Sequence, residues 1–361
     1  MYNLLSGLKD YFKRQEIIID NPVFRIHCTF TTVLLITFSM IITWTQFVGQ
    51  PIRCIVDGVP PHVVNTYCWI MTTFTMPDAF LRPSSAVAHP GVANNYDDES
   101  AQKHYTYYQW VCFVLFFQAL LCYFPKWLWE TWEHGLMNTI VCGLNIGLRT
   151  EEEKNQKKGI LIDYLIRHLN QHNMYAFRYW CCEVICFLNV IFQMFIMNWF
   201  FKGDFMSYGL KVLTFDDQDQ ENRYDNMVYV FPRVTKCTFR KFGPSATIEK
   251  HDAICILPLN IVNEKTYIFL WFWFIILAIL TAVVVIFRGL VIFMPSLRPR
   301  LMHARNRMVP EEAIESVSKR VSVGDWWVLY MLGRNIDPQI YKEVIAEFAK
   351  KNDTNQSNKQ L

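Results

Sequence analysis

The stretch YIFLWFWFIILAILTAVVVIF, residues 267–287, decides the fold of this chain. It is almost entirely apolar and contains no Asp, Glu, Lys or Arg. An α-helix needs about 20 apolar residues to cross roughly 30 Å of hydrocarbon, which is the length of this stretch. The stretch therefore predicts a helix that spans a membrane.

Three earlier apolar runs have a similar length, in a chain of 361 residues that is 52% hydrophobic and 16% aromatic. A soluble domain would instead show apolar residues in periodic stripes. The four runs predict membrane spans at 23–47, 107–127, 179–201 and 267–287. The second and third spans contain polar side chains that we expect to face protein or water: Gln118, Glu183, Asn189 and Gln193.

Basic residues predict on which side of the membrane each segment lies, because Lys and Arg are enriched in cytoplasmic loops. Five arginines follow the fourth span before the first acid, Glu311, and this places the C-terminal tail in the cytoplasm. Four crossings put the N-terminus on the same side. The predicted segments are a cytoplasmic N-terminal amphipathic helix (1–22), an extracellular loop (48–106), a cytoplasmic helical loop (128–178), a second extracellular loop (202–266) and a cytoplasmic helical tail (288–361).

The two predicted extracellular loops each contain two of the eleven cysteines, at Cys54, Cys68, Cys237 and Cys255. Cysteines outside the cell are oxidised, so we expect two disulfides, for which three pairings are possible. The remaining cysteines fall in spans or cytoplasmic segments and are expected to be free thiols: Cys28, Cys112, Cys122, Cys142, Cys181, Cys182 and Cys186.

Local patterns predict the elements between the spans. A short helix is expected over 61–74, and the alternating, β-branched residues 227–242 predict a strand. In the cytoplasmic loop, residues 151–159 (EEEKNQKKG) read as a charged turn, and residues 160–180 read as a helix that runs on into the third span. The predicted fold class is a mainly α membrane protein, a four-transmembrane-helix bundle with a small disulfide-tied α+β extracellular domain and a helical cytoplasmic domain.

In the N-terminal residues, Leu4, Leu5, Leu8 and Phe12 recur at helical spacing and would form one apolar stripe, while the charged side chains lie off this stripe. The resulting amphipathic helix can lie on lipid at the inner leaflet, or it can fold into the mouth of a pore. Asp20, Asn21 and Pro22 then predict the start of the next helix, with a capping side chain ahead of a first-turn proline.

No pattern of residues predicts an enzyme, a cofactor, a metal or a nucleic-acid partner. The chain has no GxSxG elbow, no Walker loop and no HExxH sequence. His168 and His172 have a spacing that could hold a metal, but a solvated helix face explains them better. Glu183 can line a water path or can pair with a neighbouring helix, and Pro125 can mark a hinge or a plain helix end.

Several stretches of the sequence match the pattern of a known protein family. The second span opens with Tyr107, Tyr108, Gln109, Trp110 and Val111, which is similar to the YYQWV hallmark of the innexins, the invertebrate gap-junction proteins. The chain resembles an arthropod innexin along nearly its whole length, including PIRCIV (51–56), VVNTYCWI (63–70), FPRVTKCTF (231–239), KHDAICILPLNIVNEKTYIFLWFWF (250–274) and GDWWVLYMLGRN (324–335).

The resemblance implies an assembly and a role. Innexin subunits form rings of eight, as homo-oligomers or as heteromers with other innexins, and two such hemichannels dock between adjacent cells at gap junctions of the plasma membrane. The resulting pore passes ions and small metabolites. The resemblance also implies disulfides Cys54–Cys255 and Cys68–Cys237, and a pore lined by Met1, Tyr2, Asn3 and Leu4.

Two alternatives compete with this role. One is a non-junctional, pannexin-like hemichannel that releases ATP or other small solutes. The extracellular loops contain no N-x-S/T sequon, and such bare loops favour docking. The other is a four-span adhesion protein, but the chain has neither the Cys-Cys-Gly motif of tetraspanins nor the first-loop pattern of claudins.

Overall fold

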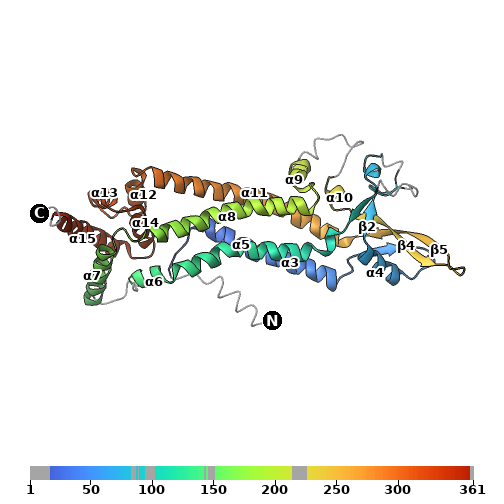
Figure 1. Cartoon of the computed structure of the whole chain (residues 1–361), viewed down its shortest axis with the longest axis horizontal. Coiled ribbons are helices and arrows are strands. Elements are labelled where there is room, and N and C mark those ends of the chain that lie inside the picture. Colours follow the sequence, from blue (N-terminus) through green and yellow to red (C-terminus); the bar gives the residue numbers. More distant parts are fainter. Residues whose placement is uncertain are drawn as a thin grey trace. The chain divides into compact units, whose positions relative to one another are not determined.

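A computed structural model describes residues 17–82, 87, 89–93, 102–141, 144, 151–213 and 226–357 (Figure 1). The chain forms two compact units. The first unit, here the helical unit, comprises Met1–Cys28, Phe124–Phe187 and Leu280–Leu361. The second, here the sheet unit, comprises Thr29–Tyr123 and Leu188–Ile279.

Four helices of the described residues are long and apolar enough to cross a membrane: Pro22–Phe47, Val111–Glu133, Asn173–Phe200 and Pro258–Phe293. The first combines α2 (Pro22–Arg25), the π-helix η1 (Ile26–Phe30) and α3 (Thr31–Phe47), and the others are α5, α8 and α11. They contain the four predicted apolar runs. Only 28% to 44% of each span is buried inside the chain, so much apolar surface is left for lipid or for other subunits.

The sheet unit contains one antiparallel sheet with the strand order β1-β5-β4-β2-β3. Its strands are β1 (Arg53–Ile55), β2 (Thr73–Thr75), β3 (Lys103–Tyr105), β4 (Val234–Phe242) and β5 (Ile248–Ile256). The predicted short helix is present as α4 (Pro61–Met71), which lies against β1 and β4 (Figure 1). The unit also contains the 3-10 helices η2 (Pro77–Phe80) and η4 (Tyr107–Gln109) and the helices α9 (Phe205–Leu213) and α10 (Asn226–Val230).

The strand predicted over 227–242 is correct only from Val234 onward. Residues 226–230 form helix α10, because Pro232 has no N–H for a ladder and interrupts the strand. The apolar residues before it pack inside the unit instead. Phe231 is fully buried against the rings of Tyr107, Phe201 and Tyr267.

The helical unit consists of helix ends and short helices packed around one apolar core. Its short helices are α6 (Leu136–Val141), α7 (Glu151–Arg167), α12 (Leu297–Arg305), α13 (Glu311–Arg320), α14 (Val323–Leu332) and α15 (Pro338–Ser357). Helix α14 is buried on nearly all sides, with Trp326 and Trp327 each 1% exposed. The predicted helical tail is therefore present, and α14 is its centre.

Two predictions for this unit were wrong. Residues 151–159 are not a turn but the beginning of α7, where three glutamates favour the first turn and Lys154 pairs with Glu151 at 3.1 Å. Helix α7 also does not continue into the third span. It ends at Arg167, Asn170 has a positive φ of 67°, and α8 begins at Asn173.

Candidate functional site

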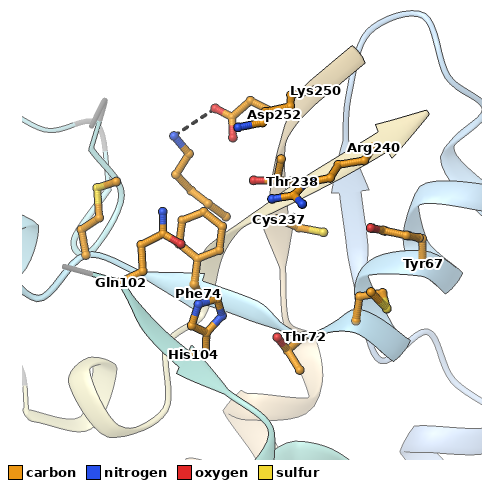
Figure 2. A pocket seen from close by; sticks show the side chains of 13 residues that line it. Tyr67, Thr72, Phe74, Gln102, His104, Cys237, Thr238, Arg240, Lys250 and Asp252 are labelled. Atoms are coloured by element: carbon orange, nitrogen blue, oxygen red, sulfur yellow. Dashed lines mark ion pairs between the residues drawn. The ribbon is translucent and has the colours of Figure 1, made fainter. Parts of the chain in front are cut away.

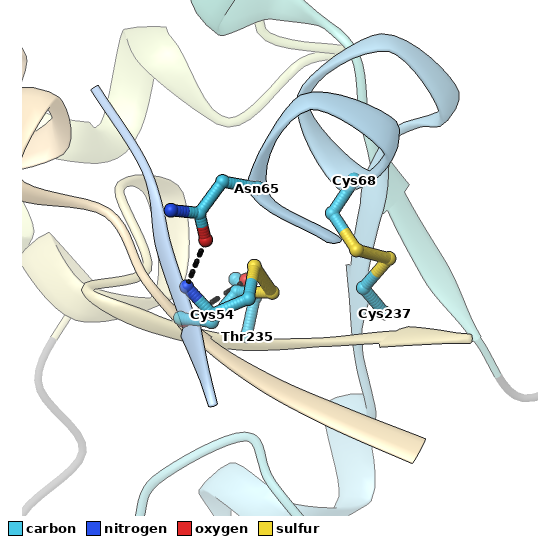
Figure 3. The surroundings of a disulfide bond; sticks show 6 residues. Cys54, Asn65, Cys68, Thr235 and Cys237 are labelled. Carbon is cyan, nitrogen blue, oxygen red and sulfur yellow. Dashed lines mark hydrogen bonds between the residues drawn. A yellow bond between two sulfur atoms is a disulfide. The ribbon is translucent and has the colours of Figure 1, made fainter. Parts of the chain in front are cut away.

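Two disulfides bind the segments of the sheet unit together (Figure 3). Cys54 of β1 is joined to Cys255 of β5, and Cys68 of α4 is joined to Cys237 of β4. These are the two pairs that the family resemblance implies. Each bond connects residues from two different loops, 201 and 169 positions apart in the sequence. The four cysteines are buried, so both loops share one small core.

A side-chain hydrogen bond adds to this connection. The Oδ1 atom of Asn65, on helix α4, accepts from the backbone N–H of Cys54 at 2.6 Å (Figure 3). The bond fixes the helix against strand β1 next to one disulfide, while the second disulfide fixes the same helix to β4. Helix and sheet can then move only as one body, which is what a surface of fixed shape requires.

The outer part of the β4–β5 hairpin extends beyond the rest of the sheet. Strand β1 pairs only with Ile254–Ile256 of β5, and β2 pairs with β4 only at Lys236. Among the described residues, those from Thr238 to Phe242 and from Ile248 to Asp252 pair only with each other and form a two-stranded ribbon. The ribbon ends in two exposed apolar side chains, Phe242 at 76% and Ile248 at 64% exposure.

Charged side chains follow the ribbon toward its base, where a cavity of about 370 Å³ opens (Figure 2). Lys236 is 5% exposed and binds Asp252 at 3.0 Å and the carbonyl oxygen of Ala93 at 3.3 Å. Arg240 and Lys250 also line the cavity. With three basic side chains and one carboxylate, the cavity presents a basic surface that suits an acidic or carbonyl group.

The five residues from Tyr107 to Val111 connect the beginning of α5 to the sheet unit. The hydroxyl of Tyr107 donates to the carbonyl oxygen of Val230 at 3.0 Å. Tyr108 packs its ring 4.7 Å from that of Trp69 on α4, and the Gln109 amide donates to the carbonyl oxygen of Trp69. Only Trp110 is exposed.

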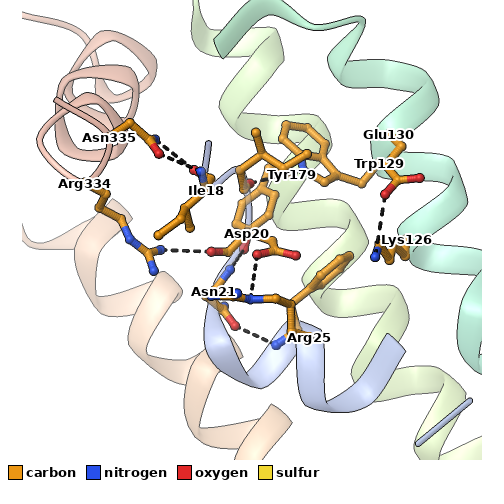
Figure 4. Close-up of polar contacts among 12 residues, drawn as sticks. Ile18, Asp20, Asn21, Arg25, Lys126, Trp129, Glu130, Tyr179, Arg334 and Asn335 are labelled. Carbon is orange, nitrogen blue, oxygen red and sulfur yellow. Dashed lines mark hydrogen bonds and ion pairs between the residues drawn. The ribbon is translucent and has the colours of Figure 1, made fainter. Parts of the chain in front are cut away.

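In the helical unit, the segment before the first span is held by the residues that follow α14 (Figure 4). Asn335 accepts from the N–H of Ile18 at 2.6 Å and donates to the carbonyl oxygen of Ile18 at 2.9 Å. Arg334 donates to the carbonyl oxygen of Asp20 at 3.0 Å. We call Ile18, Asp20, Arg334 and Asn335 the N-terminal clamp. It connects the root of the first span to the core of the helical unit.

The side chain of Asp20 is an unusual feature of this clamp. It is 3% exposed, and burial raises its pKa to about 6, against the lowering effect of Arg25, Lys126 and Arg334. Arg25 approaches it at 3.0 Å as an ion pair, without the geometry of a hydrogen bond. The next residue, Asn21, caps α2 as predicted, accepting from the N–H of Phe24 with Pro22 at the first helical position.

Beside the clamp, Glu183 of α8 and Arg288 of α11 form a buried ion pair with an N–O distance of 2.7 Å. Asn21 also donates to Glu183. The guanidinium of Arg288 lies 4.4 Å from the ring centre of Trp327, which in turn stacks on Tyr179. Of the two readings of Glu183, the paired carboxylate is therefore the one that the structure shows.

The structure also gives the positions of Pro125 and Gln193, two further residues considered in the sequence analysis. Pro125 lies inside α5, so it does not end that helix. Gln193 is buried and donates to the carbonyl oxygen of Gln118 on α5, so of the two expected surroundings, protein and water, it faces protein. Met1, Tyr2, Asn3 and Leu4 lie outside the described residues, as does Cys142.

The prediction that His168 and His172 lie on a solvated face was wrong for His172. It is 6% exposed and binds Asp325 at 2.7 Å, because the helix breaks at Asn170, whose φ is 67°, and His172 lies in the connection between α7 and α8. Burial opposes the ionisation of Asp325, but hydrogen bonds from His172, Ser322 and the Asn170 N–H hold its pKa below the ordinary value.

Sequence reasoning missed the clamp residues Arg334 and Asn335. A usable signal was present, since both follow an apolar helix within the stretch 324–335 that carries the family resemblance. Asp325, at the start of that helix, was missed for the same reason. The stretch was recognised as a resemblance, but no contact could be assigned to its polar residues.

Comparison with known proteins agrees with this architecture. The family model described as innexin matches residues 20–352 of the chain. Innexin inx1 of Schistocerca americana is 62% identical over 359 residues, which cover 99% of both chains. Innexin inx1 of Drosophila melanogaster is 61% identical over 351 residues, with 97% of both chains covered. Innexin shaking-B of the same fly is 49% identical, over 99% of this chain and 96% of the relative.

The family match extends over nearly all of the described residues, and it includes the four candidate spans, the sheet with its disulfides and the helical unit. Innexins are multi-pass plasma-membrane proteins that form oligomeric channels at gap junctions, and they are channels and not enzymes. This chain belongs to the innexin family and is a gap-junction channel subunit by that membership.

Proposed function

We propose that the chain forms a ring-shaped hemichannel, of eight subunits as the family resemblance implies, and that two hemichannels dock across adjacent cells through their sheet units. The joined pore then passes ions and small metabolites. In this proposal the chain crosses the membrane four times with both termini in the cytoplasm, and the sheet with its two disulfides lies outside the cell. The spans keep the limits expected above, and the short helices of the helical unit are cytoplasmic.

The observation that carries this proposal is the disulfide-tied sheet with its projecting ribbon. Docking requires a surface whose shape is fixed before contact, because ordering a loose loop on binding costs free energy. Two disulfides and the Asn65 bond provide this rigidity in one small core. The ribbon has free backbone edges beyond the sheet and an exposed apolar end, both of which can pair with another chain.

The cavity at the base of the ribbon supports the same role. Its basic lining fits an acidic side chain or a carbonyl group from the opposite hemichannel. Charged groups at such a surface select the correct partner more than they add affinity. A hemichannel of another innexin could therefore dock here only if its surface complements these charges.

Exposed apolar residues on the spans support oligomer formation. Trp44 is 68% exposed and Trp199 is 81% exposed within the single chain. Neighbouring subunits and lipid would cover such side chains in a membrane-embedded ring, as homo-oligomers or with other innexins.

The N-terminal clamp supports a pore role for the N-terminal residues. It anchors the chain at Ile18 and Asp20, and the family resemblance implies that Met1, Tyr2, Asn3 and Leu4 line the pore. Pro125 interrupts the hydrogen bonds of α5 and is a candidate hinge for gating.

Paired and single cells that express only this chain provide the test. We expect conductance between two paired cells, measured by double voltage clamp. Current across the membrane of single cells without conductance between pairs would instead support the pannexin-like alternative, which releases ATP or other solutes. Absence of both currents from cells with surface-labelled protein would contradict a homomeric channel.

A further inference from the structure

Three metal-ligand side chains meet where the first span contacts the third. His27 Nδ1 lies 3.4 Å from the Sγ atom of Cys28, and that sulfur lies 3.7 Å from the Sγ atom of Cys186 on α8. All three donor atoms lie within 4.8 Å of one another. His27 and Cys28 are fully buried, and Cys186 is 2% exposed.

These spacings fit a single bound ion. A zinc ion holds sulfur at about 2.3 Å and imidazole nitrogen at about 2.0 Å, so two sulfurs on one ion lie about 3.8 Å apart, and nitrogen and sulfur about 3.5 Å apart. The observed distances of 3.7 and 3.4 Å match both values. We propose that His27, Cys28 and Cys186 bind a thiophilic metal ion, Zn²⁺ or Cu⁺.

The local backbone supports a built site. His27 and Cys28 lie in the π-helix η1, Ile26–Phe30, the only π-helical segment among the described residues. A π-helical turn is rare within an α-helix and is frequently found at functional sites. Here the wider turn presents two consecutive ligands on the side that meets α8.

A small cavity lies next to one of the three ligands, Cys186. Its volume of about 10 Å³ is close to the smallest that holds a water molecule, and its other lining residues are Asn21, Glu183, Thr281 and the apolar Val23, Phe24 and Val284. Three protein ligands and one water complete the coordination of Zn²⁺, whereas Cu⁺ is satisfied by the three protein ligands alone. The cavity thus fits Zn²⁺ without excluding Cu⁺.

Charge balance favours binding of Zn²⁺ in this buried place. Two thiolates and a neutral imidazole neutralise one Zn²⁺, so the complete site has no net charge. Such a site avoids the high cost of a buried unpaired charge. The ion would connect the first span to the third and so hold the root of the first span in place.

The test uses the full chain purified in detergent, dialysed against Zn²⁺ or, under reducing anaerobic conditions, against Cu⁺. We expect about one metal ion per chain by mass spectrometry, with the preferred ion identified by competition. Cys28→Ser and Cys186→Ser should lose the ion. Cys181→Ser is the matched control, since Cys181 lies on α8 but outside the three-residue cluster, and it should keep the ion.

A second measurement does not depend on the folding of variants. Co²⁺ added to the wild-type chain should give the intense near-ultraviolet band of sulfur-to-cobalt charge transfer, and Zn²⁺ should abolish it. Absence of both the band and stoichiometric metal would overturn the proposal. Metal content that is unchanged in Cys28→Ser and Cys186→Ser, or a Cys28–Cys186 disulfide found in the purified chain, would overturn it as well.

Discussion

Asp20 is a buried carboxylate at the point where the chain enters its first span. It is surrounded by Arg25 on α2, by Lys126 and Glu130 on α5 and by Arg334 of the clamp. Three basic groups lower its pKa and Glu130 raises it, but burial has the largest effect and brings the pKa to about 6. A carboxyl group of this kind changes its charge in a range that cell acidification reaches.

The raised pKa of Asp20 predicts a defined pH dependence of stability. The folded chain binds the proton more tightly than the unfolded chain, whose carboxyl has the ordinary pKa of 3.8. The free energy of unfolding should therefore rise as the pH falls from about 7 to about 4, by at most about 3 kcal/mol from this group.

Thermal unfolding in detergent across this pH range measures the effect. Asp20→Asn should remove this part of the pH dependence, and Asp163→Asn, at an exposed side chain on α7, should leave it unchanged. Equal pH slopes for the wild type and Asp20→Asn would show that Asp20 does not titrate in this range.

The ion pair of Glu183 and Arg288 leads to a second prediction at this scale. The side chains are 2% and 12% exposed, so removing one partner leaves a buried charge without compensation. Glu183→Gln should lower the free energy of unfolding by about 3–5 kcal/mol.

The double change Glu183→Met with Arg288→Met removes both charges and should recover most of this loss. Thermal midpoints of the purified variants provide the comparison. A single variant that is as stable as the wild type would mean that water or lipid headgroups compensate the remaining guanidinium.

At the scale of elements, the sequence predicts the helices better than their ends. The four spans could be predicted because apolar runs of sufficient length have few other solutions. The predicted ends of elements were wrong where a single residue determines where a helix or strand begins or ends. Pro232 delays the beginning of the predicted strand to Val234, and Asn170, with its positive φ, breaks a helix that hydropathy alone would continue.

The disulfides of the candidate site could be predicted, because the number of possible cysteine pairings is small. Four cysteines in two loops allow only three pairings, and a family pattern selects among them. The clamp could not be predicted in this way, because Asn335 binds backbone atoms of Ile18 that are 317 positions away. Contacts to backbone leave no pattern of paired side chains in the sequence.

The clamp gives a prediction about the segment that enters the first span. Asn335→Ala removes both hydrogen bonds to Ile18 and should increase amide hydrogen exchange at residues 17–20. The open probability of the channel should change as well if the N-terminal residues line the pore.

Asn306→Ala is a suitable control for this change. The Asn306 side chain donates to the carbonyl oxygen of Met302 at the end of α12, and among the described residues it makes no hydrogen bond to Ile18 or Asp20. Exchange at residues 17–20 that is the same in Asn335→Ala and the wild type would mean that the segment is held by other contacts.

The disulfides lead to a prediction about the sheet unit. Replacing Cys54 and Cys255 together by Ser should lower the stability of the unit by about 2–5 kcal/mol and should abolish conductance between paired cells. Cys181→Ser, at a free thiol, should conduct normally. Normal coupling by the double variant at equal surface expression would show that a fixed β1–β5 connection is not needed for docking.

At the scale of the whole molecule, each unit has one task in our proposal. The sheet unit presents a rigid surface to the opposite cell, and the helical unit holds the root of the first span through the clamp. The central claim is that the ribbon formed by β4 and β5 is part of the docking surface.

Paired-cell recording of a ribbon-end variant tests this claim most directly. Phe242→Asp combined with Ile248→Asp places charge at the exposed end of the ribbon, and Met308→Asp, at an exposed residue of the helical unit, is the control. We predict that the ribbon variant loses conductance between cells but keeps single-cell hemichannel current, and that the control keeps both. Full conductance between cells that express the ribbon variant would contradict the claim.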